Sequence, residues 1–326
     1  MTRSGFLDGT STDRPGLAAG LMLFALFTLG FQDGMIRVAA PDTSIWTFQT
    51  IRSISNLMLI LILARLLWGG LPRRPERMWA VVLRSLCLLT AMFCFFGGVE
   101  QLTLAEMAAG LYTFPIFVTI LSWLILREQI GIQRISAVAI GAIGAVLILQ
   151  PGSSDFSPIK LLPVGAGLSY AGVIILTRRW CRGESPVTLA MGVALAFGAA
   201  GTLGLFTLTL SPLPTEIQQT IPYLTRGWVT PSVDVFLIAL LCSVLNLTSN
   251  IALAKAYQSA ESSWLAPFDY SYLIFATLWG WVLFNDLPDG WMALGMALIA
   301  GAGIFTAWRE NRRNRASRIE LAGGRR

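Results

Sequence analysis

The sequence predicts an all-α membrane protein whose chain crosses the bilayer ten times. Of its 326 residues, 55% are hydrophobic and only 13% are charged, whereas soluble domains carry about 25% charged residues. Several apolar stretches reach the roughly 20 residues that span a hydrocarbon core ~30 Å thick. The connectors between them are short and rich in Arg or Pro. We therefore expect membrane-spanning helices joined by short loops.

Taken in chain order, the apolar stretches predict ten helices. The first follows a polar head and is interpreted as a retained helix rather than a signal peptide, because Pro41 directly follows the weakly cleavage-like Val38–Ala40. Breakers such as Pro72–Pro75 separate later helices, and residues 211–231 are expected to form an ordered outer loop. The predicted spans are 16–36, 44–68, 79–101, 103–126, 132–150, 159–178, 186–209, 233–256, 261–284 and 288–308.

The placement of basic residues predicts the orientation. If both termini are cytoplasmic, 20 of the 24 Lys and Arg residues lie in cytoplasmic segments or helix ends. Only Arg37, Lys160 and Arg226 then lie outside, and Arg52 lies within a helix. This asymmetry is typical of a bacterial inner-membrane protein that obeys the positive-inside rule. The same placement argues against nucleic acid as a partner, because the positive charge follows the loops rather than one surface.

Two predicted helices resemble each other and indicate an internal repeat. The spans 103–126 and 261–284 carry an Ala-Glu pair near their starts and a Trp, at 123 and 281, near their ends. Five helices per repeat is an odd number, so the two halves have opposite orientations, as in many transporters. The predicted organisation is a cytoplasmic segment (1–15), a first repeat (16–150), a second repeat (159–308) and a basic cytoplasmic tail (309–326).

Several segments resemble the EamA-type branch of the drug/metabolite transporter (DMT) superfamily, over roughly residues 18–310. The similar segments are Asp33–Arg37, Gln49–Arg52, Leu83–Ser85, Phe95–Phe96, Leu104–Glu106, Phe114–Thr119, Arg127–Glu128, Ala266–Tyr270, Gly280–Trp281 and Leu287–Trp291. The resemblance implies ten helices in two inverted five-helix repeats around a central cavity. Its members carry diverse solutes, including amino acids, flavins and S-adenosylmethionine, so it does not specify the substrate.

These observations predict a secondary transporter that moves a small organic metabolite across the cytoplasmic membrane by alternating access. Export of an amino-acid-like compound is slightly favoured. Uptake of a vitamin- or nucleoside-like solute, of the riboflavin or S-adenosylmethionine type, is the alternative. A membrane-embedded enzyme is a remote alternative, because the chain has no His and no Gly-x-Ser-x-Gly motif; a channel is another. A nucleotide-binding loop of the form G-x-x-x-x-G-K-[ST] is also missing from the sequence.

Charged residues inside apolar helices are the first candidates for a substrate or coupling site. A carboxylate at the depth of Asp269 is costly unless it is paired, hydrated or protonated, so it is a candidate for binding a cation or a proton. Arg52 lies at a comparable depth and cannot lose its proton, so an Asp269–Arg52 ion pair is one alternative. Structural duty is favoured for Arg52.

Three more charged candidates lie towards the predicted outer surface. Asp33 and Arg37 are four residues apart on one helical face, so an ion pair between them is the favoured interpretation, with a role in an outer gate as the alternative. Glu106 lies in the first turn of its helix, where it complements the helix dipole. A position at the mouth of a cavity is equally compatible with its place in the sequence.

Polar and aromatic residues complete the candidate set. Ser243, Asn246 and Asn250 form a stripe at i, i+3 and i+7 that either joins helices or binds a polar solute. Six aromatic residues could line a cavity or pack between helices: Tyr112, Tyr170, Trp264, Phe268, Tyr270 and Tyr272. No cofactor or metal is expected, and the predicted partners are a small-molecule substrate and lipid. Whether the chain forms a homodimer stays open.

Overall fold

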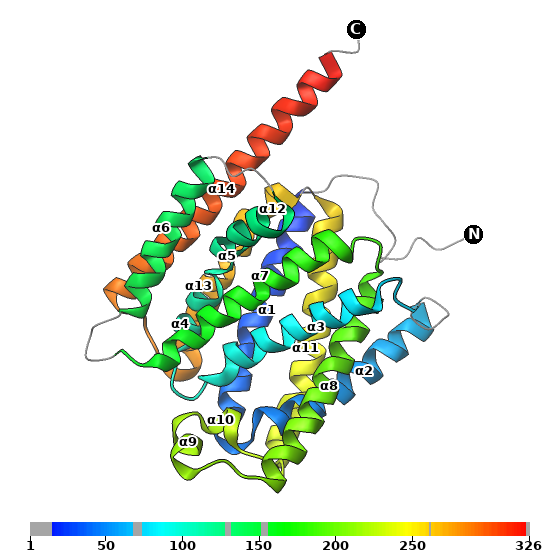
Figure 1. The fold of residues 1–326 in the computed structure, drawn as a ribbon, viewed down its shortest axis with the longest axis vertical. Coiled ribbons are helices and arrows are strands. Elements are labelled where there is room, and N and C mark those ends of the chain that lie inside the picture. Colours follow the sequence, from blue (N-terminus) through cyan, green and yellow to red (C-terminus); the bar gives the residue numbers. More distant parts are fainter. Residues whose placement is uncertain (1–14, 68–73, 128–131, 151–155, 261, 324–326) are drawn as a thin grey trace.

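The computed structural model describes residues 15–67, 74–127, 132–150, 156–260 and 262–323 (Figure 1). Expectations for residues 1–14, for the turn at 151–152 and for residues 324–326 of the tail lie outside this part. Every regular element in the described ranges is a helix, which confirms the predicted all-α class. The elements are α1 (Pro15–Ala39), η1 (Ala40–Asp42), α2 (Ile45–Leu67), α3 (Met78–Gly97), α4 (Leu104–Leu111), α5 (Phe114–Leu121), η2 (Ser122–Leu126), α6 (Ile132–Leu149), η3 (Pro158–Leu161), α7 (Leu162–Trp180), α8 (Pro186–Leu210), α9 (Thr215–Thr220), α10 (Pro222–Thr225), α11 (Val233–Ser259), α12 (Ser262–Asp269), α13 (Ser271–Phe284) and α14 (Gly290–Gly323).

Hydroxyl side chains mark where several helices begin. Thr103, Ser185 and Ser232 precede α4, α8 and α11, and each accepts a hydrogen bond from a backbone amide of the following turn. Such a cap satisfies a donor that has no partner within the helix. Prolines stand at the start of α5, α7 and α8, where a missing N–H removes no helical hydrogen bond.

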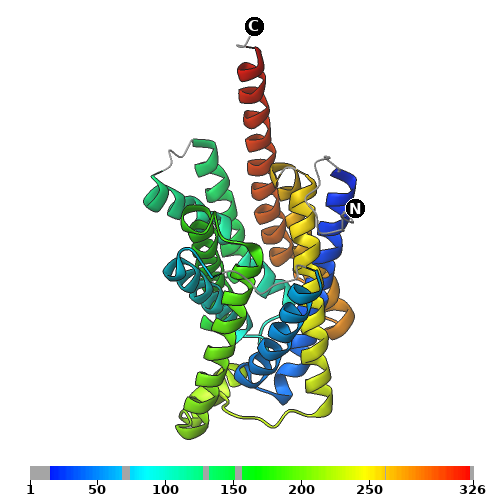
Figure 2. The same ribbon diagram turned by 90° about the vertical axis from the view of Figure 1, so that its right-hand side faces the viewer.

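The observed helices follow the predicted spans with three differences. The predicted helix 103–126 is divided into α4, α5 and the π-helical η2, and the predicted helix 261–284 is divided into α12 and α13. The predicted helix 288–308 continues as α14 to Gly323. The described part of the basic tail therefore extends this helix beyond the rest of the bundle (Figure 2).

Seven stretches are long and apolar enough to cross a membrane by length and composition. They are Pro15–Asp42, Ile45–Ile62, Met78–Gly97, Leu104–Leu126, Pro158–Trp180, Thr188–Leu210 and Val233–Tyr257. Ile135–Leu149 and Gly290–Phe305 are shorter apolar helices. The ten-span topology stays a prediction, in which these two helices and the broken pair α12–α13 complete the set.

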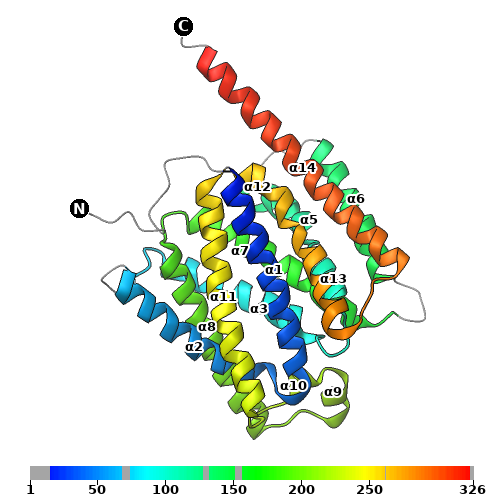
Figure 3. The same cartoon turned by 180° about the vertical axis from the view of Figure 1, so that it is seen from behind.

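The helix packing keeps its pattern when the two halves of the chain are exchanged. α1 packs on α11, and α7 packs on α3. α1 also packs on α12 and α13, just as α7 packs on α4 and α5 (Figure 3). α2 packs on α8, and α6 packs on α14. Each of these pairs joins equivalent helices of the two halves, so exchanging the halves leaves the pair unchanged. This pattern is the one expected of two related five-helix units.

Two glycines allow α6 and α14 to cross closely. A Cβ atom added to Gly144 would lie 2.7 Å from the Gly295 carbonyl oxygen, and one added to Gly295 would lie 2.6 Å from the Gly144 carbonyl oxygen. Both distances are shorter than van der Waals contact. Small residues at such a crossing let two membrane helices approach closely.

Alternate connections of the chain meet at one end of the bundle, the α9–α10 end (Figure 1). Arg226 donates to the Pro41 carbonyl at 2.8 Å and lies 3.6 Å from Glu100. Gln101 donates to the Thr220 carbonyl at 3.1 Å. Burial raises the pKa of the Glu100 carboxyl, and the charge of Arg226 opposes that rise. The connections after α1, α3 and α8 therefore share one polar face.

An accessibility experiment tests the predicted orientation. In a variant without native cysteines, Thr230→Cys at the α9–α10 end should react with an impermeant thiol reagent in intact cells, whereas Arg182→Cys should react only after permeabilisation. Both side chains are exposed. Cys181 is only 2% exposed, so its failure to react would carry no information about sidedness. Labelling of Arg182→Cys in intact cells would reverse the orientation.

Candidate functional site between two broken helices

The breaks in two helices face each other inside the bundle. Tyr112 separates α4 from α5, and Tyr270 separates α12 from α13. Each break has a nearby proline, Pro115 or Pro267, which removes a backbone donor and disfavours a continuous helix. The two tyrosine ring centroids are 5.4 Å apart. Irregular backbone at membrane depth is tolerated where protein or a cavity surrounds it, so these breaks are candidates for a solute site.

An aromatic cluster surrounds the two breaks; we define it as Tyr112, Phe114, Tyr170, Tyr270 and Tyr272. The rings of Tyr112 and Tyr272 are stacked, with centroids 5.6 Å apart and an interplanar angle of 14°. Phe114 links Tyr112 to Tyr170 through edge contacts of 5.6 and 5.4 Å. The Tyr112 hydroxyl also donates to the Asp269 carbonyl at 2.7 Å. The cluster thus joins α4, α5, α7, α12 and α13.

The Asp269 side chain lies at this cluster. It is partly buried and is close enough to interact electrostatically with Tyr112, Tyr170 and Tyr270. Tyr257 on α11 is a fourth neighbour of this kind. Among the described residues the Asp269 carboxylate forms no ion pair, so the alternative in which it pairs with Arg52 is not found. A carboxylate in this setting can receive a proton or a cation.

Asp33 belongs to a second polar group, on α1 and α2. Its side chain is 8% exposed, accepts a hydrogen bond from Tyr272 at 2.5 Å and another from Gln32 at 3.3 Å. Arg52 interacts electrostatically with Asp33. The buried charge of Arg52 is therefore opposed by Asp33 on the neighbouring helix rather than by Asp269.

The predicted ion pair between Asp33 and Arg37 is wrong. Arg37 instead pairs with Asp286 and places its guanidinium carbon 4.1 Å from the centroid of the Phe284 ring. Asn285 has φ 59°, a left-handed conformation that ends α13 and turns the following residue towards α1. Asp33 faces the interior, where Tyr272 supplies a donor.

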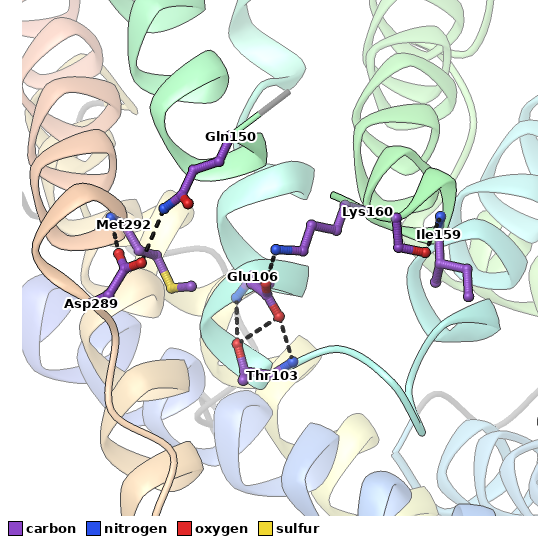
Figure 4. Close-up of polar contacts among 8 residues, drawn as sticks. Thr103, Glu106, Gln150, Ile159, Lys160, Asp289 and Met292 are labelled. Carbon is purple, nitrogen blue, oxygen red and sulfur yellow. Dashed lines mark hydrogen bonds and ion pairs between the residues drawn. The ribbon is translucent and has the colours of Figure 1, made fainter. Parts of the chain in front are cut away.

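Glu106 is engaged in helix capping and in an ion pair (Figure 4). It accepts a hydrogen bond from the Thr103 amide at 2.9 Å, while Thr103 accepts one from the Glu106 amide at 3.2 Å. Lys160 lies 3.1 Å from the same carboxylate. This reciprocal capping box satisfies two backbone donors. The contacts favour the structural interpretation of Glu106 over a role at a cavity mouth.

A second capping residue lies in the same region (Figure 4). Asp289 accepts a hydrogen bond from the Met292 amide at 2.6 Å and one from Gln150 at 3.0 Å, which connects α6 to α14. The hydrogen bond from Met292 and that from Gln150 hold the pKa of Asp289 below its ordinary value. The connections around α4, α6, α7 and α14 are thus fixed by polar contacts.

The polar stripe on α11 does not act as one surface. Ser243 is fully buried and donates to the Ala239 carbonyl at 2.9 Å and to the Arg52 carbonyl at 3.4 Å. Asn250 is exposed and donates to the Asn246 carbonyl at 2.7 Å. Ser243 therefore joins α11 to α2, as the helix-packing alternative predicts. Phe268 packs against the core beside the aromatic cluster.

Sequence reasoning missed Gln32. Its signal was an amide next to a carboxylate inside an otherwise apolar helix. Only the fold shows that Asp33, to which the Gln32 amide donates, contacts Tyr272 and interacts with Arg52. Among the described residues no group of three or more His, Cys, Asp and Glu side chains could hold a metal ion.

Residues 16–150 match the EamA-like transporter family. This segment is an EamA domain. It coincides with the predicted first repeat, and the match confirms the family that the sequence resembles. The EamA match does not extend to residues 159–308, whose status as a second repeat stays a prediction.

Relatives named as transporters are similar to most of the chain. A riboflavin transporter of Vibrio cholerae is 29% identical over 93% of this chain and 94% of its own length. An S-adenosylmethionine uptake transporter of Rickettsia prowazekii is 27% identical over 75% of this chain and 77% of its own length. One solved crystal structure shares the fold, with a TM-score of 0.58 and 18% identity over 90% of this chain and 98% of that chain.

These relatives correct the favoured functional prediction. Export of an amino-acid-like compound finds no support among them, whereas the alternative, a carrier for a vitamin- or nucleoside-like solute, agrees with their names. The sequence alone provided little basis for ranking the two, because polar, acidic and aromatic side chains suit both classes of solute.

Proposed function

We propose that the chain is a secondary transporter that carries a planar heteroaromatic solute of the riboflavin type into a bacterial cell across the inner membrane. The observation that carries this proposal is the aromatic cluster at the two helix breaks. Aromatic side chains stack favourably on flat heterocycles, at about 1–3 kcal/mol per stacked base in comparable sites. The name of the riboflavin-transporting relative supports the same class of solute.

Alternating access between two inverted repeats is part of the proposal. Three pairs of residues lie 158 positions apart: Tyr112 with Tyr270 at the breaks, Trp123 with Trp281, and Arg127 with Asn285. The last pair are both left-handed residues, with φ 56° and 59°. Together with the exchangeable helix packing, this supports two units of 16–150 and 159–308 that rock about a site between them. Both termini would be cytoplasmic.

S-Adenosylmethionine is the second candidate, because of one observation. The Asp269 carboxylate lies among the tyrosines with no ion pair in the described part of the chain, and this solute carries a sulfonium and an ammonium group. Riboflavin is uncharged, so with this substrate the Asp269 carboxylate would bind a proton instead of a cationic group. The two candidates therefore differ in what they require of Asp269.

Uptake of radiolabelled riboflavin, measured in riboflavin-auxotrophic bacteria that lack an importer, tests the proposal. We expect the chain to confer uptake and Tyr112→Leu to reduce its rate about tenfold, since a stacking surface is lost. Trp281→Leu is the matched control, because Trp281 is half-exposed and outside the cluster. Uptake of S-adenosylmethionine but not riboflavin would select the second candidate, and uptake of neither would refute the proposal.

A further inference from the structure

A buried polar group adjoins the aromatic cluster and is formed by Gln32, Asp33 and Arg52. The three residues are 3%, 8% and 9% exposed. Gln32 and Asp33 lie on α1 and Arg52 lies on α2, and two consecutive residues of α11 contact these two helices. Cys242 Sγ lies 3.8 Å from the Gln32 carbonyl, and Ser243 Oγ lies 3.4 Å from the Arg52 carbonyl. α11 therefore packs on the parts of α1 and α2 that carry this polar group.

Two atoms of this polar group have no hydrogen-bond partner among the described residues. They are the Gln32 amide oxygen, an acceptor, and the Arg52 Nε–H, a donor. Leaving such groups buried and unpaired is unfavourable, and native proteins rarely do so without a ligand or water. The Gln32 oxygen needs a donor, and the Arg52 Nε–H needs an acceptor.

The charges of the polar group restrict that ligand group further. Asp33 repels an anion, and Arg52 repels a cation. Neutral hydroxyls meet these conditions, because a hydroxyl can donate to the Gln32 oxygen and can also accept from the Arg52 Nε–H. A chain of several hydroxyls can therefore serve both atoms.

Tyr272 connects the polar group to the aromatic cluster. Its ring is stacked on Tyr112, and its hydroxyl donates to Asp33. A flat surface and a hydroxyl-binding surface therefore adjoin one another. We propose that Gln32, Asp33 and Arg52 bind the hydroxyl-bearing chain or sugar of a solute whose heteroaromatic ring stacks on the tyrosines. This inference rests on the proposed function and names the second half of its substrate site.

A ligand pair that differs only in its hydroxyls tests the inference. Riboflavin carries a polyhydroxyl chain on its ring nitrogen, and lumiflavin carries a methyl group there. We expect the purified full chain to bind riboflavin at least about tenfold more tightly, because lumiflavin leaves buried polar groups unpaired. Gln32→Leu should weaken the affinity for riboflavin about tenfold and change the affinity for lumiflavin less than about twofold. Flavin fluorescence in a titration measures both affinities.

Two further variants separate recognition from folding. Arg52→Lys keeps the charge opposite Asp33 but removes Nε–H. It should therefore also reduce the difference in affinity between riboflavin and lumiflavin. Ser122→Ala is the matched control, because Ser122 is fully buried with an unpartnered hydroxyl on another helix. It should leave the ratio of the two affinities unchanged.

The possible results distinguish this inference from the proposed function. Equal affinity of the unmodified chain for both flavins, or an equal loss of both in Gln32→Leu, would overturn the inference while the proposed function stands. In that case ordered water alone satisfies Gln32 and Arg52. If neither flavin binds, adenosine and 9-methyladenine provide the same comparison for the second candidate substrate. Failure of both pairs would refute the proposed function and the inference together.

Discussion

Asp269→Asn is expected to abolish proton-driven accumulation of substrate while leaving exchange of substrate between the two sides intact. The amide keeps the size of the side chain but can neither ionise nor carry a proton. With one proton moved per substrate, a pH gradient of about two units supports roughly 100-fold accumulation, and the variant should reach none. Reconstituted liposomes with labelled riboflavin and an imposed pH gradient measure both properties.

Asp33→Asn provides the comparison for this prediction. Asp33 is also a carboxylate inside an apolar helix, but it accepts a hydrogen bond from Tyr272, is opposed by Arg52 and belongs to the proposed substrate site. The variant is therefore expected to bind substrate more weakly while still coupling transport to protons. If Asp33→Asn lost coupling and Asp269→Asn accumulated substrate normally, the proton-coupling carboxylate would be Asp33 rather than Asp269. Weaker binding at every pH in Asp269→Asn would instead indicate direct pairing with a cationic substrate, since a desolvated charge would have lost its partner.

Gly167→Val is expected to prevent accumulation of folded protein. Gly167 lies where α7 crosses the break between α4 and α5, and an added Cβ atom would be 2.7 Å from Thr113 Oγ1 and 2.9 Å from the Leu111 carbonyl oxygen. One of these atoms belongs to the backbone, so relief requires the helices to separate. Overpacking costs about 1–3 kcal/mol for small insertions, and a β-branched side chain at this crossing should exceed that. Size-exclusion chromatography in detergent measures the folded fraction.

Gly165→Ala on the same helix provides the comparison. A Cβ atom there would meet only Cys94 Sγ, at the ordinary contact distance of 3.7 Å. Alanine also has a higher helix propensity than glycine, by about 1 kcal/mol, so this variant should be at least as stable as the unmodified chain. If Gly167→Val were produced in normal amounts and were monodisperse, the prediction would be wrong, and α7 could move away from α4 and α5 at little cost.

Local sequence similarity only partly predicts which positions of the two proposed repeats are equivalent. The Trp pair at 123 and 281 has the same spacing as the left-handed residues Arg127 and Asn285, which supports the proposed repeat. The Ala-Glu pairs at the starts of these helices suggested a spacing three residues shorter. The structure instead aligns the breaks at Tyr112 and Tyr270, and only these positions fix the register of the central site.

The sequence by itself determined the helical class, the apolar stretches and the residues whose burial is costly. These properties follow from how many consecutive residues are apolar and where charges interrupt them, so they can be counted along one chain. Asp269 was identified in this way, as a carboxylate deep in an apolar segment. The family match over residues 16–150 agrees with these local features.

Only the tertiary structure decided which buried polar groups meet. Arg37 pairs with Asp286, 249 residues away, and Tyr272 donates to Asp33 across 239 residues. A nearby partner in sequence, such as Asp33 for Arg37, was the natural expectation because neighbours on one helical face are always within reach. The choice of partner depends instead on the rotation of each helix about its own axis, which packing of the whole bundle sets.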